Sequence, residues 1–261
     1  MFSTAWTLAI ALALQSAGVT PAPQASAVTR ETGTVWTDDR PLTHFFQNLV
    51  TDVRALPSKD SAVWLTAGGT AAAVLHGSDR RVADWSLRSG ESRYADAGHL
   101  VGDGFVQAGG AVAAYAFGKL AGKPQVAHVG SDLIRAQALN GLVTTALKVS
   151  VNRTRPNGGH YAFPSGHTSA TFASAAVLQA HYGWKAGAPA LGVASVVGWA
   201  RVRDRKHWLS DVAFGAGLGV ISGRTVARTH RSKLTVVPVK TKGGFALTFF
   251  VNLQPATYNQ H

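Results

Sequence analysis

The chain has 261 residues, enough for one large domain with a sizeable core, and it carries 25 Lys and Arg against 13 Asp and Glu, a formal net charge of +12. This excess of positive charge favours anionic partners such as phosphorylated molecules, nucleic acid or an anionic membrane surface. The absence of cysteine excludes a lipid-anchored cysteine, a thiol nucleophile and cysteine-ligated zinc.

Residues 1–27 carry no charged side chain. An apolar run from Ala5 to Leu14 is followed by a stretch rich in Pro, Ser and Ala that ends in Ala25-Ser26-Ala27, which is typical of a signal-peptide cleavage site. We therefore expect residues 1–27 to be a signal peptide and the protein to be exported, periplasmic or secreted. Membrane association is the alternative, because uncharged runs such as 61–78 and 104–118 follow; they are short for spanning helices.

Apolar periodicity predicts helices in the region 28–232 and a change of structure after it. Alternating residues at 234–239 and 245–253, separated by a turn containing Gly243-Gly244, predict a β-hairpin. The expected fold is all-α: a bundle of about six to seven helices over 28–232, with a small C-terminal hairpin appendage over 233–261. The expected helices cover 43–56, 61–75, 98–120, 131–151, 165–182, 190–201 and 207–228, with a short amphipathic piece at 82–87.

The segment Pro164-Ser165-Gly166-His167 directly precedes a long run of small and apolar residues. The free N–H groups and the positive dipole end of a helix that starts here would form an anion site. Gly166 permits close approach of an anion, and His167 titrates near neutral pH. Taken alone, the segment is equally explained as a capped helix after a proline.

Two further clusters lie at predicted helix ends. Lys148 and Arg155 flank the end of one helix, where basic residues also complement the helix dipole. Arg201, His207 and Asp211 lie near the next such junction, and the spacing of His207 and Asp211 places them on one helical face. An Asp that accepts a hydrogen bond from an imidazole fixes its tautomer and raises its basicity.

Together the clusters match the needs of phosphoryl transfer, which requires positive donors, an in-line nucleophile and an acid for the leaving oxygen. Positive charge would come from Lys148, Arg155 and Arg201. The N–H groups of Ser165 and Gly166, with the Ser165 hydroxyl, would bind the phosphoryl oxygens as neutral donors. Of the two histidines, His207 and His167, one would attack phosphorus and the other would protonate the leaving oxygen. No acidic cluster in these segments suggests a metal, so we expect no cofactor and no metal.

The pattern Lys148-x6-Arg155-Pro156, then Pro164-Ser165-Gly166-His167, then Arg201-x5-His207-x3-Asp211 resembles the signature of the type 2 phosphatidic acid phosphatase and vanadium haloperoxidase superfamily. The resemblance implies an all-α bundle with the site between helix ends. It also implies a metal-independent phosphohistidine mechanism in which His207 attacks phosphorus, Asp211 orients His207, and His167 protonates the leaving group. The phosphate would be held by Lys148, Arg155, Arg201, Ser165 and Gly166.

One position departs from the family pattern: Ala200 stands where the third motif usually has Ser before its Arg. We expect this serine to support the site rather than to react. Arg153 lies outside the motif and is interpreted as a rim charge, and Asp103, alone in an apolar region, has no assigned role.

The sequence thus predicts a phosphatase for phosphate monoesters or lipid phosphates and diphosphates. The alternatives are a vanadate-dependent haloperoxidase that uses the same pocket, or a non-catalytic basic protein that binds anions by charge. The expected partner is a phosphorylated small molecule or lipid, without specific nucleic acid, and with peripheral contact to an anionic membrane. The identity of the ester and the oligomeric state do not follow from the sequence.

Overall fold

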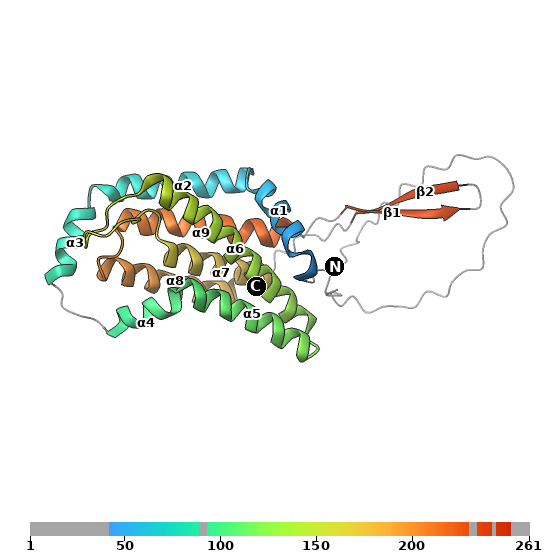
Figure 1. Cartoon of the computed structure of the whole chain (residues 1–261), viewed down its shortest axis with the longest axis horizontal. Coiled ribbons are helices and arrows are strands. Elements are labelled where there is room, and N and C mark those ends of the chain that lie inside the picture. Colours follow the sequence, from blue (N-terminus) through green and yellow to red (C-terminus); the bar gives the residue numbers. More distant parts are fainter. Residues whose placement is uncertain (1–41, 89–92, 230–233, 242–243, 252–261) are drawn as a thin grey trace, which may run out of the picture. The chain divides into compact units, whose positions relative to one another are not determined.

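The structure is a computed structural model and describes residues 42–88, 93–229, 234–241 and 244–251 (Figure 1). Backbone contacts divide the chain into Met1–Val35 and Trp36–His261. The first unit, and with it the predicted signal peptide, lies outside the described residues, so export stays a prediction.

The described residues up to 229 form helices joined by loops, without a strand, which confirms the predicted all-α class. The expected number of helices was too low, because the structure contains nine α-helices in this part of the chain. The elements are η1 (Leu42–His44), α1 (Phe45–Ala55), α2 (Lys59–His76), α3 (Asp79–Arg88), α4 (Arg93–Gly102), α5 (Gly104–Leu120), α6 (Pro124–Val151), α7 (Gly166–Tyr182), α8 (Trp184–Arg203) and α9 (Leu209–Thr229).

Two strands follow, β1 (Leu234–Thr241) and β2 (Gly244–Val251), paired antiparallel with Thr241 opposite Gly244. The turn at 242–243 and the residues from 252 onward lie outside the described part of the chain. The hairpin as a C-terminal appendage therefore stays a prediction.

The helix expected over 98–120 is divided into α4 and α5 at Asp103. The Asp103 carboxylate accepts hydrogen bonds from the N–H groups of Phe105 (2.8 Å) and Val106 (3.3 Å) at the start of α5. Asp is a preferred N-cap residue because its oxygen satisfies donors that have no partner within the helix. This capping role accounts for a residue that the sequence left unexplained.

Two other helices are longer than predicted, and each contains a proline near its N-terminal end. α6 begins at Pro124, seven positions before the expected start, with the proline in the first turn, where its missing N–H costs nothing. α8 begins at Trp184, before the expected start at 190, and contains Pro189 within the helix, where a proline has no N–H to donate.

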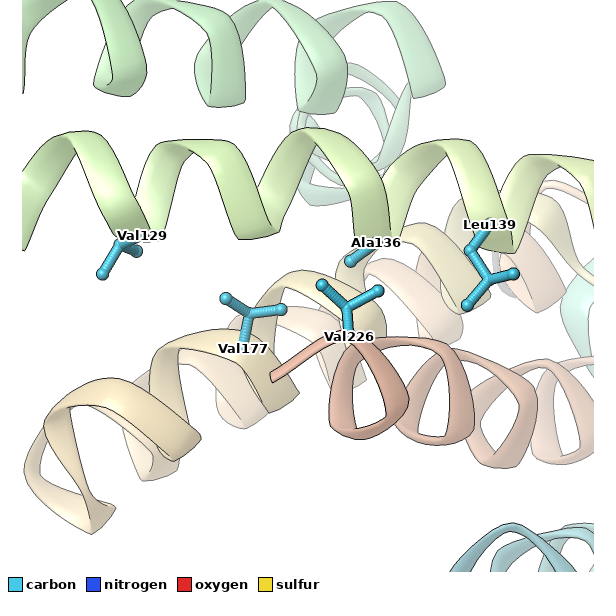
Figure 2. Packing of buried hydrophobic residues seen from close by; sticks show 5 residues of the cluster. All are labelled: Val129, Ala136, Leu139, Val177 and Val226. Carbon is cyan, nitrogen blue, oxygen red and sulfur yellow. The ribbon is translucent and has the colours of Figure 1, made fainter. Parts of the chain in front are cut away.

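The apolar core lies where α6 packs against α7 and α9. Figure 2 shows Val129, Ala136 and Leu139 of α6 facing Val177 of α7 and Val226 of α9. All five are nearly or fully buried. The side chains are of small or medium size, so the three helices approach closely along the part of α6 between Val129 and Leu139.

A row of glycines sets the distance between α9 and α7. Because the residues are spaced four apart, they lie on one face of α9. A Cβ at any of them would come within 3.0 Å of atoms of α7, closer than real Cβ contacts allow. These residues are Gly215, Gly219 and Gly223. The backbones of the two helices are therefore in direct contact.

The neighbouring pair Gly68-Gly69 of α2 behaves differently at its two positions. A Cβ on Gly68 would lie 3.2 Å from the Cα of Gly217 in α9, whereas a Cβ on Gly69 would meet nothing within 4 Å. Gly68 thus allows α2 and α9 to pack closely, while Gly69 does not face a neighbour.

Among the helices that the structure describes, none combines the length and the apolar character needed to cross a membrane.

We expect Gly219→Ala to lower the free energy of unfolding by about 1–3 kcal/mol, since the new methyl group must displace packed atoms of α7. Gly69→Ala is the matched control in a helix interior: it gains helix propensity without a clash and should be neutral or stabilising by about 0.5–1 kcal/mol. Denaturant unfolding followed by circular dichroism measures both. Equal effects of the two substitutions would show that the glycine row does not limit the packing distance.

Candidate active site

The three sequence motifs lie at the ends of α6, α7 and α8 and at the start of α9. The charges of Lys148, Arg155 and Arg201 all act on the imidazole of His207, so the motifs meet in space. The predicted site residues are Lys148 in the last turn of α6, Arg155 in the following loop, Ser165, Gly166 and His167 at the start of α7, Arg201 in the last turn of α8, and His207 and Asp211 at the start of α9.

The His207 imidazole is fixed by a backbone carbonyl. Its Nδ1 lies 2.5 Å from the carbonyl oxygen of Ala162 and 3.9 Å from Oδ2 of Asp211. Because a carbonyl oxygen only accepts, Nδ1 carries the hydrogen, which leaves the lone pair on Nε2. Burial and the charge of Lys148 hold the pKa of His207 well below 6.5, although the bond to Ala162 acts in the opposite direction. His207 is therefore neutral near pH 7, the form that a nitrogen nucleophile requires.

Asp211 holds the backbone around His207 rather than the ring itself. Its Oδ1 accepts from Nη1 of Arg153 (2.6 Å), its Oδ2 accepts from the N–H of Trp208 (2.8 Å), and its carbonyl accepts from the N–H of Ser165 (3.1 Å). Burial raises the pKa of this carboxyl, against the bonds from Trp208 and Arg153. The direct hydrogen bond to His207 expected from the spacing is not formed; Asp211 acts on His207 through the next residue, Trp208.

Arg153 was interpreted as a rim charge, and this was wrong. Besides Asp211, its guanidinium donates to the Ser210 hydroxyl (2.8 Å) and to Oδ2 of Asp79 (2.8 Å). Asp79 is buried and also accepts from the N–H (3.0 Å) and hydroxyl (2.6 Å) of Ser210. These bonds fasten α3, the loop after α6 and the start of α9 to one another.

Asp79 is the residue of this site that sequence reasoning missed. It lies 131 positions from Ser210, and an Asp in the first turn of a short helix has an ordinary explanation as a complement to the helix dipole. No motif or periodicity connects it with the phosphate-site residues, so its role is visible only in the folded chain.

The N-terminus of α7 differs in detail from the predicted cradle. The Ser165 N–H is already donated to Asp211, and the Ser165 hydroxyl lies 2.9 Å from that of Thr168 without capping the helix. The N–H groups of the first helical turn, beginning with Gly166, have no acceptor within the helix. A Cβ on Gly166 would first meet Cε of Lys148 at 3.6 Å, so an anion at this helix end would lie beside the ammonium.

The three basic side chains are crowded and partly desolvated. Lys148 donates to the carbonyl of Tyr161 (2.8 Å), and burial, followed by the charge of Arg155, lowers the pKa of Lys148 to about 8. Burial likewise lowers the pKa of Arg201, which is 3% exposed and lies 3.4 Å from Asp204. The Nε atoms of Arg155 and Arg201 are buried without a partner among the described residues. Such a group of cations favours a bound oxyanion, which would supply the missing acceptors.

His167 lies at the same helix end with its Nε2 buried and, in the part of the chain that the structure describes, without a hydrogen-bond partner. Its ring meets that of His99 edge to face, with 5.2 Å between centroids. Gly102 packs against it so closely that a Cβ there would lie 3.1 Å from Cβ of His167. Burial, reinforced by the charge of Arg201, lowers the pKa of His167 to about 4.

A cavity of about 510 Å³ adjoins Lys148, Gly166 and His167. It extends from the phosphate-site residues along α5, α6 and α7, and its other walls are mostly small or apolar side chains. They include Ala108, Val112, Ile134, Ala138, Asn140, Thr144 and Ala170. The cavity therefore has one charged end and a largely apolar remainder.

Ala200, which replaces the usual serine of the third motif, is fully buried where α4 crosses α8. A Cβ on Gly98 of α4 would lie 2.5 Å from the Cβ of Ala200. The methyl group therefore occupies a contact between helices that leaves little room for a larger side chain.

Comparison with known proteins indicates the same family as the sequence motifs do. Residues 131–234 match the family described as the PAP2 superfamily. Over 97 residues the chain is 38% identical to the lipid A 1-phosphatase of Porphyromonas gingivalis, which covers 36% of this chain and 22% of that protein. The chain thus matches less than a quarter of the length of this relative.

The fold is similar to a crystal structure described as the first transmembrane PAP2 type phosphatidylglycerolphosphate phosphatase from Bacillus subtilis. The TM-score is 0.51 at 18% sequence identity, and the likeness covers 72% of this chain and 94% of that one. At this identity the comparison concerns the fold.

We expect Asp79→Asn to lower the free energy of unfolding by about 1–3 kcal/mol, because it removes one of the two buried carboxylates that pair with Arg153 and weakens the buried hydrogen bonds of Ser210. Asp60→Asn is the matched control. Asp60 also joins two helices through arginines, Arg224 (2.8 Å) and Arg228 (2.9 Å), but in a partly exposed position, where such pairs contribute about 1 kcal/mol or less. Denaturant titration of both variants compares the two positions. A smaller loss for Asp79→Asn than for Asp60→Asn would contradict the role given to the buried network.

Proposed function

We propose that this chain, whose residues 131–234 belong to the PAP2 superfamily, is a phosphoric ester hydrolase that acts on lipid phosphates through a phosphohistidine intermediate. The observation that carries the proposal is the state of His207. It is buried, neutral and oriented by the Ala162 carbonyl, and it lies within the field of three cationic side chains.

In the first step, Nε2 of His207 attacks phosphorus, a P–N bond forms and the bond to the ester oxygen breaks. Lys148, Arg155 and Arg201 neutralise the equatorial oxygens, and the N–H groups at the start of α7 add neutral donors. In the second step, water attacks the phosphohistidine, the P–N bond breaks, and inorganic phosphate leaves. His207 then returns to its neutral form.

His167 is the group assigned to protonate the departing ester oxygen and, in reverse, to accept a proton from the attacking water. With a pKa of about 4 in the free protein, it is neutral near pH 7. A bound phosphoryl group brings negative charge next to the imidazole, which raises its pKa. The proton can also arrive on the substrate, since a phosphate monoester has a second pKa near ~6.

Two features support a lipid rather than a small soluble ester. The cavity that adjoins Lys148 and His167 is mostly apolar beyond its charged end. Large apolar side chains are also exposed on two of the helices that line it, among them Phe105 (89%) and Leu120 (89%) of α5 and Leu142 (56%) of α6. Exposed apolar surface of this kind marks contact with a membrane or a protein partner.

The names of the two relatives fit this substrate class, since lipid A and phosphatidylglycerolphosphate are both phosphorylated lipids. We further propose that the protein acts at the surface of an anionic membrane outside the cytoplasm. The net charge of +12 and the exposed apolar side chains support contact with the membrane surface, and the signal peptide expected at residues 1–27 is the basis for placing the protein outside the cytoplasm.

We expect His207→Ala to abolish release of phosphate from an aryl phosphate and from phosphatidate, while EDTA leaves the rate of the unmodified protein unchanged. The variant loses the nucleophile, and Lys148, Arg155 and Arg201 rather than a metal neutralise the phosphate. His44→Ala, in exposed η1, is the control and should retain full activity. Turnover by the His207→Ala protein, or its loss with EDTA in the unmodified protein, would overturn the mechanism.

The pKa of Lys148 predicts an alkaline limit to activity. Lys148 is positive below about pH 8 and neutral above it, so kcat/KM should fall as the pH rises through 8, where the phosphate ester no longer titrates. Lys148→Arg should shift this limb to higher pH, because a guanidinium stays charged.

Lys185→Arg, at an exposed position of α8, is the control for the Lys148 experiment and should keep the limb at its original pH. A pH profile of kcat/KM over the three proteins tests the assignment. An unchanged limb in Lys148→Arg would mean that another group causes it.

A further inference from the structure

A second group of polar side chains lies at the other end of α6 and α7 from the phosphate site. His128 and Asp132 are in the first turns of α6, and His181 is in the last turn of α7. His167 and His181 are separated by 14 positions of α7, a helical rise of about 21 Å. None of the three residues belongs to the phosphatase motifs.

The ligand atoms of these residues converge. Nε2 of His181 lies 2.9 Å and Nε2 of His128 lies 3.9 Å from the same carboxylate oxygen, Oδ2 of Asp132. One nitrogen or oxygen atom from each residue lies within 4.8 Å of the others. The spacing of His128 and Asp132 by four positions places both on one face of α6, turned toward α7.

Asp132 is held in place from its other side. Its second oxygen, Oδ1, accepts from Nη2 of Arg135 (2.5 Å), and Nη1 of Arg135 donates to Asp52 of α1 (2.9 Å). Asp52, Asp132 and Arg135 are all at most 1% exposed. A carboxylate that is oriented by a second hydrogen bond is the usual arrangement around a metal ligand.

We propose that His128, Asp132 and His181 form a binding site for a zinc ion that fastens α6 to α7. Two imidazole nitrogens and one carboxylate oxygen are ligands that Zn²⁺ prefers, and such a set leaves a fourth position for water. Figure 2 shows that Val129 and Val177, one turn before Asp132 and His181, face each other across this seam. The ion would therefore close the end of the α6–α7 contact, remote from the phosphoryl chemistry.

The test uses the full chain without a histidine tag, stripped of metal by a chelator and dialysed. We expect the protein to bind one equivalent of Zn²⁺ in equilibrium dialysis and to gain thermal stability, because an ion that binds only the folded state raises Tm. His128→Gln removes one ligand but keeps the hydrogen bond between His181 and Asp132. It should weaken zinc binding by at least about tenfold and remove the rise in Tm.

The controls separate this site from surface histidines and from the catalytic proposal. His44→Gln, at an exposed histidine, should bind zinc as the unmodified protein does. Metal removal should lower Tm without changing turnover measured well below Tm. Lack of stoichiometric binding, or equal binding by His128→Gln, would show that the cluster is a hydrogen-bonded ion network with a protonated histidine, and would overturn the zinc site while leaving the phosphatase proposal intact.

Discussion

The candidate active site depends on the hydrogen bonds made by a single residue, Asp211. One carboxylate oxygen accepts from the N–H of Trp208, next to His207, the other accepts from Arg153 of the loop after α6, and the backbone carbonyl accepts from the N–H of Ser165 at the start of α7. Three segments that are distant in sequence are thus held by one buried side chain and its own peptide group. A buried carboxylate is stable only when such donors surround it, so the same bonds that satisfy Asp211 also fix the geometry of the site.

Burial determines the protonation states of the histidines and of Lys148 in the site. Desolvation disfavours the charged forms of His207, His167 and Lys148, which keeps both histidines neutral near pH 7 and lowers the pKa of Lys148 to about 8. Since the cations repel one another and are poorly hydrated, a phosphoryl group that neutralises them would bind strongly. The site is in this sense incomplete without an anion.

The sequence predicted the fold class because helical periodicity in the chain is strong and long, as over 165–182, where the structure has α7. The sequence was less accurate in predicting helix boundaries, which single residues determine. Asp103 ends one helix and begins another, and Pro124 begins rather than interrupts α6. The motifs predicted that Lys148, Arg155, Arg201 and His207 lie near one another, as they do in the structure, but they did not reveal which atoms form hydrogen bonds. The carbonyl of Ala162, and not the carboxylate of Asp211, orients His207. A sequence does not reveal which backbone carbonyl lies beside a side chain.

Asp79 shows that the region similar to a known family depends on residues outside that region. The region with recognisable family likeness, residues 131–234, contains every group assigned to phosphate chemistry. Yet Asp79 of α3 and Asp52 of α1, which hold Arg153 and Arg135, lie before it. The stretch of sequence with family likeness is therefore shorter than the stretch that contributes buried ion pairs to it. A fragment trimmed to the region of likeness would contain all of the proposed phosphate-site residues, but Arg153 and Arg135 would each lose one of their two carboxylate partners and keep only Asp211 and Asp132.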